Sequence, residues 1–226
     1  MTTVTLTPKE KRKLRPQYSE LNMKGKYALA DVNNIGYVDL ECENLDGNWG
    51  CIITASVYIR NVQDESKNKI VSWRITKKDL RRYERSGLKD EPDKHLVESL
   101  IKCLSKLDLV MTHYGVGWNK FDMPFLRTRA AVVGVKQLPY KKVKYGDVWK
   151  YSHLLFKVNS YRLETIGDLY GFKLKTKLDP KYWRGAKIGN KKSIDYILKH
   201  NKKDVLLTYK IHKEIESMMP VPAVYL

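Results

Sequence analysis

Three extended segments follow one another along the chain before any long helical segment begins, and this order restricts the possible folds more than any other property of the sequence. The segments cover residues 35–41, 51–60 and 70–75, are rich in β-branched and aromatic residues, and are separated by short polar turns. Both properties are typical of β-strands. Three strands joined in this way predict an antiparallel three-strand meander.

Helical and extended segments alternate after the meander. Helices are predicted over residues 94–107, 123–133, 162–170 and 193–218, and short strands over 109–113 and 145–149. In the first of these helices the apolar residues recur at the spacing of one helical face. Strands followed by alternating helices and strands predict an α/β fold, in which parallel strands extend the meander into a mixed sheet flanked by helices.

The chain shows no internal repeat and no linker that would divide this unit. We expect one domain over residues 35–219, a basic N-terminal arm over 1–34 and a C-terminal tail over 220–226. A short helix is predicted near residues 8–14, because Thr7 and Glu10 fit a capping box with Pro8 at the first helical position.

The formal charge favours a polyanion as the binding partner. The 226 residues contain 43 Lys and Arg against 25 Asp and Glu, which leaves a net charge of +18. Hydrophobic residues make up 42% of the chain, which is enough for a core. Because solubility requires a much smaller charge surplus, nucleic acid is the first partner to test.

Other features of the composition argue against secretion and membrane insertion. The sequence contains no apolar stretch of about 18 residues and no signal-peptide pattern. The three cysteines, Cys42, Cys51 and Cys103, lack the spacing of a zinc site and do not indicate a disulfide framework. We expect an intracellular, cytoplasmic protein without a membrane partner, encoded by a cell or by a virus.

The positive charge is concentrated in residues 134–192, which also hold many of the aromatic residues. Single-stranded nucleic acid binds surfaces of this composition, because rings stack on bases while cations follow phosphates. The alternative is that the lysines keep the protein soluble and the rings belong to the core. The candidate nucleic-acid-binding cations are Lys141, Lys142, Lys144, Lys173, Lys175, Lys177, Lys181 and Arg184.

Two carboxylates lie on the first predicted strand. Asp39 and Glu41 are two residues apart, so both side chains leave the same face of the strand, whereas Val38 and Leu40 point to the other face. Carboxylates on a buried strand need a compensating cation, and Mg²⁺ or Mn²⁺ suits hard oxygen ligands. The alternative is a solvent-exposed acidic pair.

Two further segments carry candidate functional groups. Asp122 follows a glycine-containing loop and precedes Pro124 at the start of a predicted helix, where it binds a ligand or merely caps the helix. His200 and Asp204 are four residues apart on the last helix, so they are neighbours on one helical face. An ordinary surface hydrogen bond would have the same spacing.

These segments, taken together and in this order, resemble the DEDD, or DnaQ-like, 3′→5′ exonucleases with a ribonuclease H-like fold. The closest resemblance is to the proofreading domains of family-B DNA polymerases and to stand-alone YprB-type nuclease domains. The likeness covers about residues 35–216 and includes the segment 162–171, Arg-Leu-Glu-Thr-Ile-Gly-Asp-Leu-Tyr-Gly. It implies that Asp39, Glu41, Asp122 and Asp204 bind two divalent metal ions, Mg²⁺ or Mn²⁺.

One position departs from the pattern of that family. One subfamily has Tyr four residues before the last acid and the other has His five residues before it, whereas this chain has His200 at the tyrosine spacing. His200 either accepts a proton from the attacking water and orients it, or only bonds to Asp204 or the substrate. Tyr196 lies two helical turns from Asp204 and is the second candidate for orienting the water.

The resemblance implies a metal-dependent exonuclease that removes nucleoside 5′-monophosphates from the 3′ end of a single-stranded or frayed strand. DNA is favoured as the substrate, and RNA is also a candidate. Asn119 and Phe121, beside Asp122, are further candidates for nucleic-acid binding. The alternatives are a structure-specific endonuclease and a non-catalytic nucleic-acid-binding module with the same fold.

Overall fold

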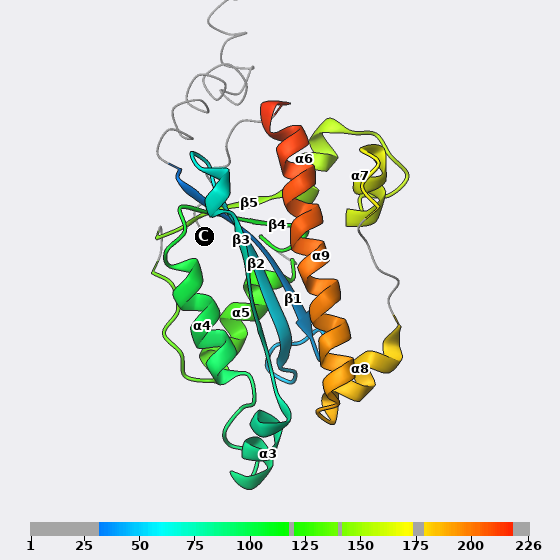
Figure 1. The fold of residues 1–226 in the computed structure, drawn as a ribbon. Coiled ribbons are helices and arrows are strands. Elements are labelled where there is room, and N and C mark those ends of the chain that lie inside the picture. Colours follow the sequence, from blue (N-terminus) through cyan, green and yellow to red (C-terminus); the bar gives the residue numbers. More distant parts are fainter. Residues whose placement is uncertain (1–31, 118–119, 140–141, 174–178, 219–226) are drawn as a thin grey trace, which may run out of the picture.

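The computed structural model describes residues 32–117, 120–139, 142–173 and 179–218. Within these residues, five strands form one mixed sheet in the order β3-β2-β1-β4-β5 (Figure 1). The strands are β1 (Asn34–Cys42), β2 (Ile52–Asn61), β3 (Lys69–Arg74), β4 (Leu109–Thr112) and β5 (Lys144–Asp147). The first three pair antiparallel, whereas β1 pairs with β4 and β4 with β5 in parallel. The predicted α/β fold, with a meander extended by parallel strands, is confirmed.

Helices cover both faces of this sheet (Figure 1). One face carries α4 (Lys94–Leu104) and α5 (Asp122–Val132), and the other carries α6 (Val148–Leu155), α7 (Leu163–Leu169) and the long α9 (Lys191–Ile215). Two further helices, α3 (Lys77–Arg85) and α8 (Pro180–Lys187), lie towards one end of the molecule in the same view. The short 3-10 helices are η1 (Glu65–Lys67) and η2 (Glu216–Met218).

Strand β1 separates two hydrophobic cores. Val38 and Leu40 pack with residues of α4 and α5, whereas Ile35 and Tyr37 pack with α9 on the opposite face. Because side chains alternate along a strand, Asp39 and Glu41 share the face of Tyr37. Both acids therefore point towards α9, on the central strand of the sheet, and are not the solvent-exposed pair of the alternative.

Several predicted boundaries are wrong. The helix predicted over 94–107 ends at Leu104, and the strand predicted over 145–149 ends at Asp147. Asp147 accepts a hydrogen bond from the main-chain N–H of Trp149, so it caps α6 at the point where β5 ends. Residues that look like the end of a strand in the sequence thus form the first turn of a helix.

Helices α3, α6 and α8 were not predicted, although the signals that begin them are local. Thr76 and Asp79 form a capping box at the start of α3. Asp179 caps α8, and Pro180 occupies its first position. Neither α3 nor α8 has a long apolar periodicity, so hydrophobic spacing does not identify these helices.

Several predictions lie outside the described residues. These are the helix near residues 8–14, nearly all of the basic arm, the tail over 220–226, and the candidates Asn119, Lys141, Lys175 and Lys177. The last residues assigned to the arm are described: Val32 is buried and β1 begins at Asn34. None of the helices in the described ranges has the length and apolar content of a membrane span.

Candidate active site

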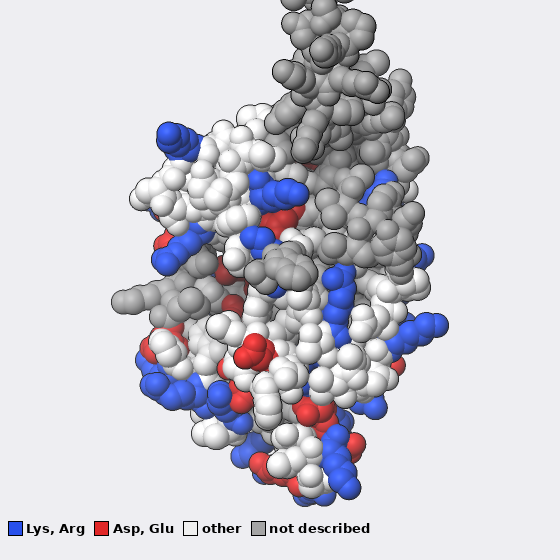
Figure 2. All heavy atoms as spheres, turned by 180° about the vertical axis from the view of Figure 1, so that it is seen from behind, with Lys and Arg blue, Asp and Glu red and all other residues white. Residues whose placement is uncertain are grey.

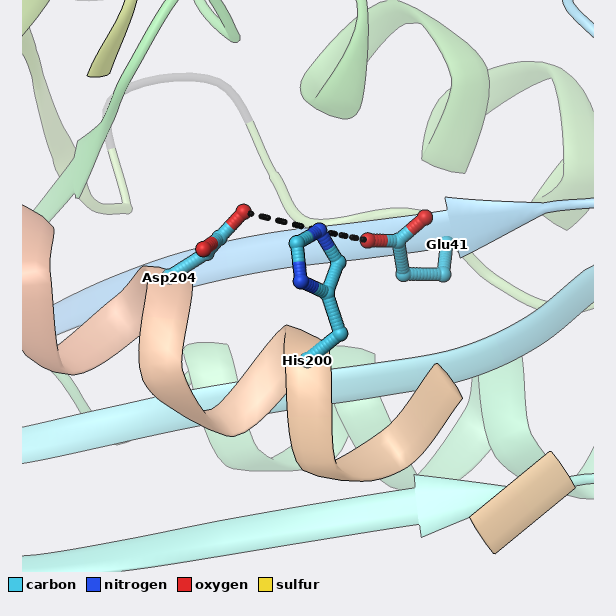
Figure 3. A group of neighbouring side chains, drawn as sticks. All are labelled: Glu41, His200 and Asp204. Carbon is cyan, nitrogen blue, oxygen red and sulfur yellow. Dashed lines mark ion pairs between the residues drawn. The ribbon is translucent and has the colours of Figure 1, made fainter. Parts of the chain in front are cut away.

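Glu41, His200 and Asp204 meet between β1 and α9 (Figure 3). His200 Nε2 lies 3.6 Å from Glu41 Oε1 and 3.4 Å from Asp204 Oδ2. One potential ligand atom from each residue lies within 4.8 Å of the others. The buried imidazole of His200 therefore lies between two carboxylates, one from the strand and one from its own helix.

Asp39 adjoins this cluster and is held by a residue that was not selected from the sequence. The Asn201 side-chain amide donates to Asp39 Oδ2 at 2.5 Å and to the Asp39 main-chain oxygen at 2.9 Å. Burial raises the pKa of Asp39 well above its ordinary value, and the charges of Glu41, Asp122 and Asp204 raise it further. All four acids implied by the resemblance are thus near enough to interact.

Asp122 joins the cluster from the first turn of α5. Its Oδ1 accepts a hydrogen bond from the Leu40 main-chain N–H at 3.0 Å, which ties α5 to β1. The N-cap position belongs to Phe121, so the alternative that Asp122 only caps the helix is not supported. Burial raises the pKa of Asp122 to about 7, and the neighbouring Asp147 carboxylate contributes to the increase.

Asp147 is a fifth acid of this region; it is buried, and it was also not selected from the sequence. Its carboxylate accepts hydrogen bonds from the main-chain N–H groups of Tyr114, Gly115 and Val116 at 2.9, 2.9 and 3.0 Å. The loop after β4 is therefore wrapped around Asp147. A side chain at Gly115 would overlap the Asp122 carboxylate, so this loop also forms the wall beside Asp122.

The carboxylates open onto a cleft. Asp39 and Asp204 line an open space of about 760 Å³, together with His113, Tyr114 and Trp149 from the segments next to them. Residues 160–164 also line this space. Asp39 and Asp204 are therefore accessible to a substrate in the cleft.

The basic residues proposed as a nucleic-acid path are not part of this cleft in the described structure. Lys142, Lys173, Lys181 and Arg184 are exposed, whereas Lys144 and Phe121 are half-buried. Lys181 pairs with Asp179 at 2.7 Å, and the Phe121 ring packs on Phe125 at 5.1 Å between centroids. On the face drawn in Figure 2, Lys and Arg side chains are spread widely and alternate with Asp and Glu.

The order of the sheet, the helices on both of its faces and the acids between β1 and α9 define an α/β protein of the ribonuclease H-like class. The chain belongs to the RNase_H superfamily, whose family model matches residues 36–216. The prediction of a ribonuclease H-like fold is therefore confirmed.

Two individual proteins are similar to this chain. A DNA polymerase of Methanocaldococcus jannaschii is 30% identical over a 174-residue alignment that covers 66% of this chain and 10% of that protein. The chain thus spans about a tenth of the length of that relative. The nuclease domain of 3′hExo, a DEDDh family member bound to rAMP, has a TM-score of 0.53 at 12% identity, over 87% of this chain and 98% of that domain. This similarity shows a shared fold.

The donor set fits divalent cations. The carboxylates of Asp39, Glu41, Asp122 and Asp204 are hard oxygen ligands, and the pKa of Asp39 is raised by burial and then by the charges of its acidic neighbours. A bound cation of high charge would remove this repulsion.

We expect the metal-free protein to lose stability as the pH rises. The pKa of Asp122 is about 7 in the folded protein against 3.8 ordinarily, so the folded state retains a proton that the unfolded chain releases. This contribution to the free energy of unfolding is fully present below about pH 4 and is lost as the pH rises through about 7. Denaturation of wild type and Asp122→Asn over this range measures it.

The Asp122→Asn variant should lack this part of the pH dependence, because it has no carboxylate to titrate at position 122. Added Mg²⁺ should stabilise the wild type more above about pH 7 than near pH 5, since protons compete with the cation for the carboxylates. Equal stabilisation by Mg²⁺ at both pH values would contradict the proposed donor set.

We also expect Asn201→Ala to weaken metal binding by roughly 10–100-fold, the effect typical of a residue that orients a metal ligand. The variant removes the amide that holds Asp39. The concentration of Mg²⁺ that gives half-maximal activity measures the change. Asn190→Ala is the matched control, since Asn190 caps α9 by accepting from the Ser193 N–H at 3.1 Å and lies outside the cluster. It should lower stability by about 1 kcal/mol without changing the metal dependence.

Proposed function

We propose that the protein is a metal-dependent 3′→5′ exonuclease that removes nucleoside 5′-monophosphates from single-stranded or frayed ends, with residues 35–219 as the nuclease domain. The observation that carries the proposal is the convergence of four carboxylates and His200, two of whose members, Asp39 and Asp204, line an open cleft. A binding module would gain nothing from such a cluster, because clustered negative charge repels phosphate.

Asp39, Glu41, Asp122 and Asp204 would hold two divalent cations, Mg²⁺ or Mn²⁺. When bound, such a pair makes a water nucleophilic and stabilises the charge that develops on the leaving 3′ oxygen. The protein residues do the positioning: Asn201 fixes Asp39, and the Leu40 N–H fixes Asp122. His200 Nε2, which lies between Glu41 and Asp204, takes the proton of the attacking water or orients that water.

Two comparisons support the choice of substrate. The similar protein from M. jannaschii is a DNA polymerase, which favours DNA as the substrate of this chain. The similar nuclease domain was crystallised with rAMP, a nucleoside monophosphate of the class that we propose as the product. RNA remains the second substrate to test.

The decisive experiment compares matched single-stranded DNA and RNA oligonucleotides with Mg²⁺, with Mn²⁺ and with a chelator. A label at the 5′ end should give a ladder that shortens from the 3′ end, and the chelator should abolish it. Circular single-stranded DNA should remain intact, because it has no 3′ end. Cleavage of circles would identify an endonuclease, and metal-independent binding without hydrolysis would identify a binding module.

A further inference from the structure

Four aromatic side chains form a continuous row along the cleft next to the carboxylates. Tyr114 and Trp149 meet edge to face with 5.0 Å between centroids, Trp149 lies 4.0 Å from His153, and His153 stacks on Tyr161 at 3.5 Å. Tyr114 comes from the loop after β4, Trp149 and His153 from α6, and Tyr161 from the segment before α7. We call these four residues the ring row.

The ring row shares its cleft with the acids. The lining of the 760 Å³ space includes all four rings together with Asp39 and Asp204. A strand whose end lies at the carboxylates therefore has these rings along its path. The proposed function requires such a path, because an exonuclease must hold several nucleotides behind the one that it removes.

Exposure distinguishes the ring row from the aromatic clusters that only pack the core. Tyr37 and Tyr209 also contact each other edge to face, at 5.4 Å, but their exposed fractions are 0% and 9%. In the ring row, Tyr114 is 43% exposed, His153 is exposed, and Trp149 and Tyr161 are half-buried. Tyr161 also packs against the core that contains α9, but core packing does not account for the other three rings.

The rings are held in place by contacts away from the cleft. The main-chain N–H of Trp149 donates to Asp147, and the Tyr161 hydroxyl donates to the Phe156 main-chain oxygen at 2.8 Å. Lys120 Nζ lies over the Tyr114 and Trp149 rings at 3.7 and 3.4 Å from their centroids. Rings fixed in this way lose little freedom when they bind a ligand, which favours stacking.

Two cations accompany the ring row. Lys120 lies over Tyr114 and Trp149, and the exposed Arg162 follows Tyr161 and lines the cleft. Rings that stack on bases, with cations that contact phosphates, are the combination that binds single strands without sequence preference. Double-stranded nucleic acid would not present its base faces to the rings.

We infer that the ring row is the platform on which the bases of a single strand stack while its 3′ end lies at Asp39 and Asp204. This inference rests on the proposed function for the direction of the strand, but the stacking itself is independent of hydrolysis. Trp149, His153 and Tyr161 lie within residues 134–192, so the platform assigns the base stacking expected of that segment to these rings, together with Tyr114.

The test is a binding measurement in chelator, so that no strand is cut. The probes are a single-stranded DNA oligonucleotide and an abasic oligonucleotide of the same length, which has the same phosphates but no bases. Trp149→Leu should weaken binding of the first by roughly 5- to 150-fold, the effect of removing one base–ring stack, and leave binding of the second nearly unchanged. Trp149→Phe should retain most of the affinity, because it keeps a ring.

Trp49→Leu is the matched control, since Trp49 is 81% exposed and does not line this cleft. It should bind both probes like the wild type. His153→Ala is the second variant, because its exposed side chain can be removed even if Trp149→Leu fails to fold. It should also weaken binding of the base-containing probe selectively.

Two results would overturn the inference: equal weakening for both probes, or wild-type affinity in both Trp149→Leu and His153→Ala. If the oligonucleotide is still degraded from its 3′ end with Mg²⁺ in either case, the proposed function stands without the platform. Selective loss of the base-containing probe in a protein that never hydrolyses DNA or RNA would instead support the platform and reject the nuclease.

Discussion

Alanine in place of Asp39, Glu41, Asp122 or Asp204 should lower the rate of metal-dependent hydrolysis by roughly 10³-fold or more, while the protein stays folded. A metal ion that polarises a phosphoryl oxygen contributes several kcal/mol to the transition state, and about 1.4 kcal/mol corresponds to a factor of ten. The fold should persist because each substitution removes a carboxylate from a crowded acidic cluster. Single-turnover rates in Mg²⁺ measure the loss. Thermal unfolding without metal should show unchanged or raised stability except in Asp122→Ala, which leaves the buried Leu40 N–H without its partner.

Asp195→Ala is the matched control for this series. Asp195 is also an acid of α9, but it pairs with Arg74 and Lys191 on the surface, outside the cluster. Its replacement should leave the hydrolysis rate near that of the wild type. Near-normal rates in two or more of the four cluster variants would show that the proposed metal ligands are wrong.

His200→Ala should lower the rate by roughly 10²–10⁴-fold, which is the contribution typical of a positioned acid–base group, with a much smaller loss of substrate affinity. The imidazole is buried and lies between Glu41 and Asp204, where it can contact a water held by those carboxylates. Because truncation also removes a partner of both acids, the Mg²⁺ dependence of the variant should be measured with the rate.

Tyr196→Phe is the comparison for His200→Ala. The Tyr196 ring stacks on Tyr182 of α8 with 3.7 Å between centroids, so its main contact in this packing lies away from Asp204. We expect a small effect on the rate from the loss of its hydroxyl. A severe loss in Tyr196→Phe with a mild one in His200→Ala would instead assign the orientation of the water to Tyr196.

Much of the fold follows from local patterns. The meander and the parallel strands were predicted with boundaries within one or two residues for most strands, because alternating apolar residues and polar turns identify them. The helices that were missed, α3, α6 and α8, begin at capping residues and are short. Hydrophobic spacing does not identify such helices, since only a small part of each contacts a core.

Part of the candidate site likewise follows from the geometry of single elements, and part does not. The shared face of Asp39 and Glu41 follows from the two-residue period of a strand, and the proximity of His200 to Asp204 follows from the turn of a helix. Asn201 could not be selected by such a rule, because its partner Asp39 is 162 residues away in the sequence. No local property of the sequence distinguishes a helical asparagine that orients a metal ligand from one on the surface.

The contacts of Asp147 and the assembly of the ring row depend on the tertiary structure even more than the position of Asn201 does. In the sequence Asp147 falls inside the strand predicted over residues 145–149, and only the fold brings three main-chain N–H groups of the 114–116 loop onto its carboxylate. The lysines and aromatic residues of 134–192 indicated nucleic acid by composition, yet the packing of α6 against the loop after β4 placed Trp149 and His153 in the cleft.

The sequence alone therefore determined the meander and the parallel strands that follow it, the face that Asp39 and Glu41 share and the acidic residue types suited to a metal site. These properties depend on the geometry of single elements, which the local chain specifies. The tertiary structure decided that α9 meets β1 through His200 and Asn201, and that an aromatic cleft leads to the carboxylates. Such contacts depend on how distant elements pack, because the backbone geometry of one element does not fix which residue of another lies against it.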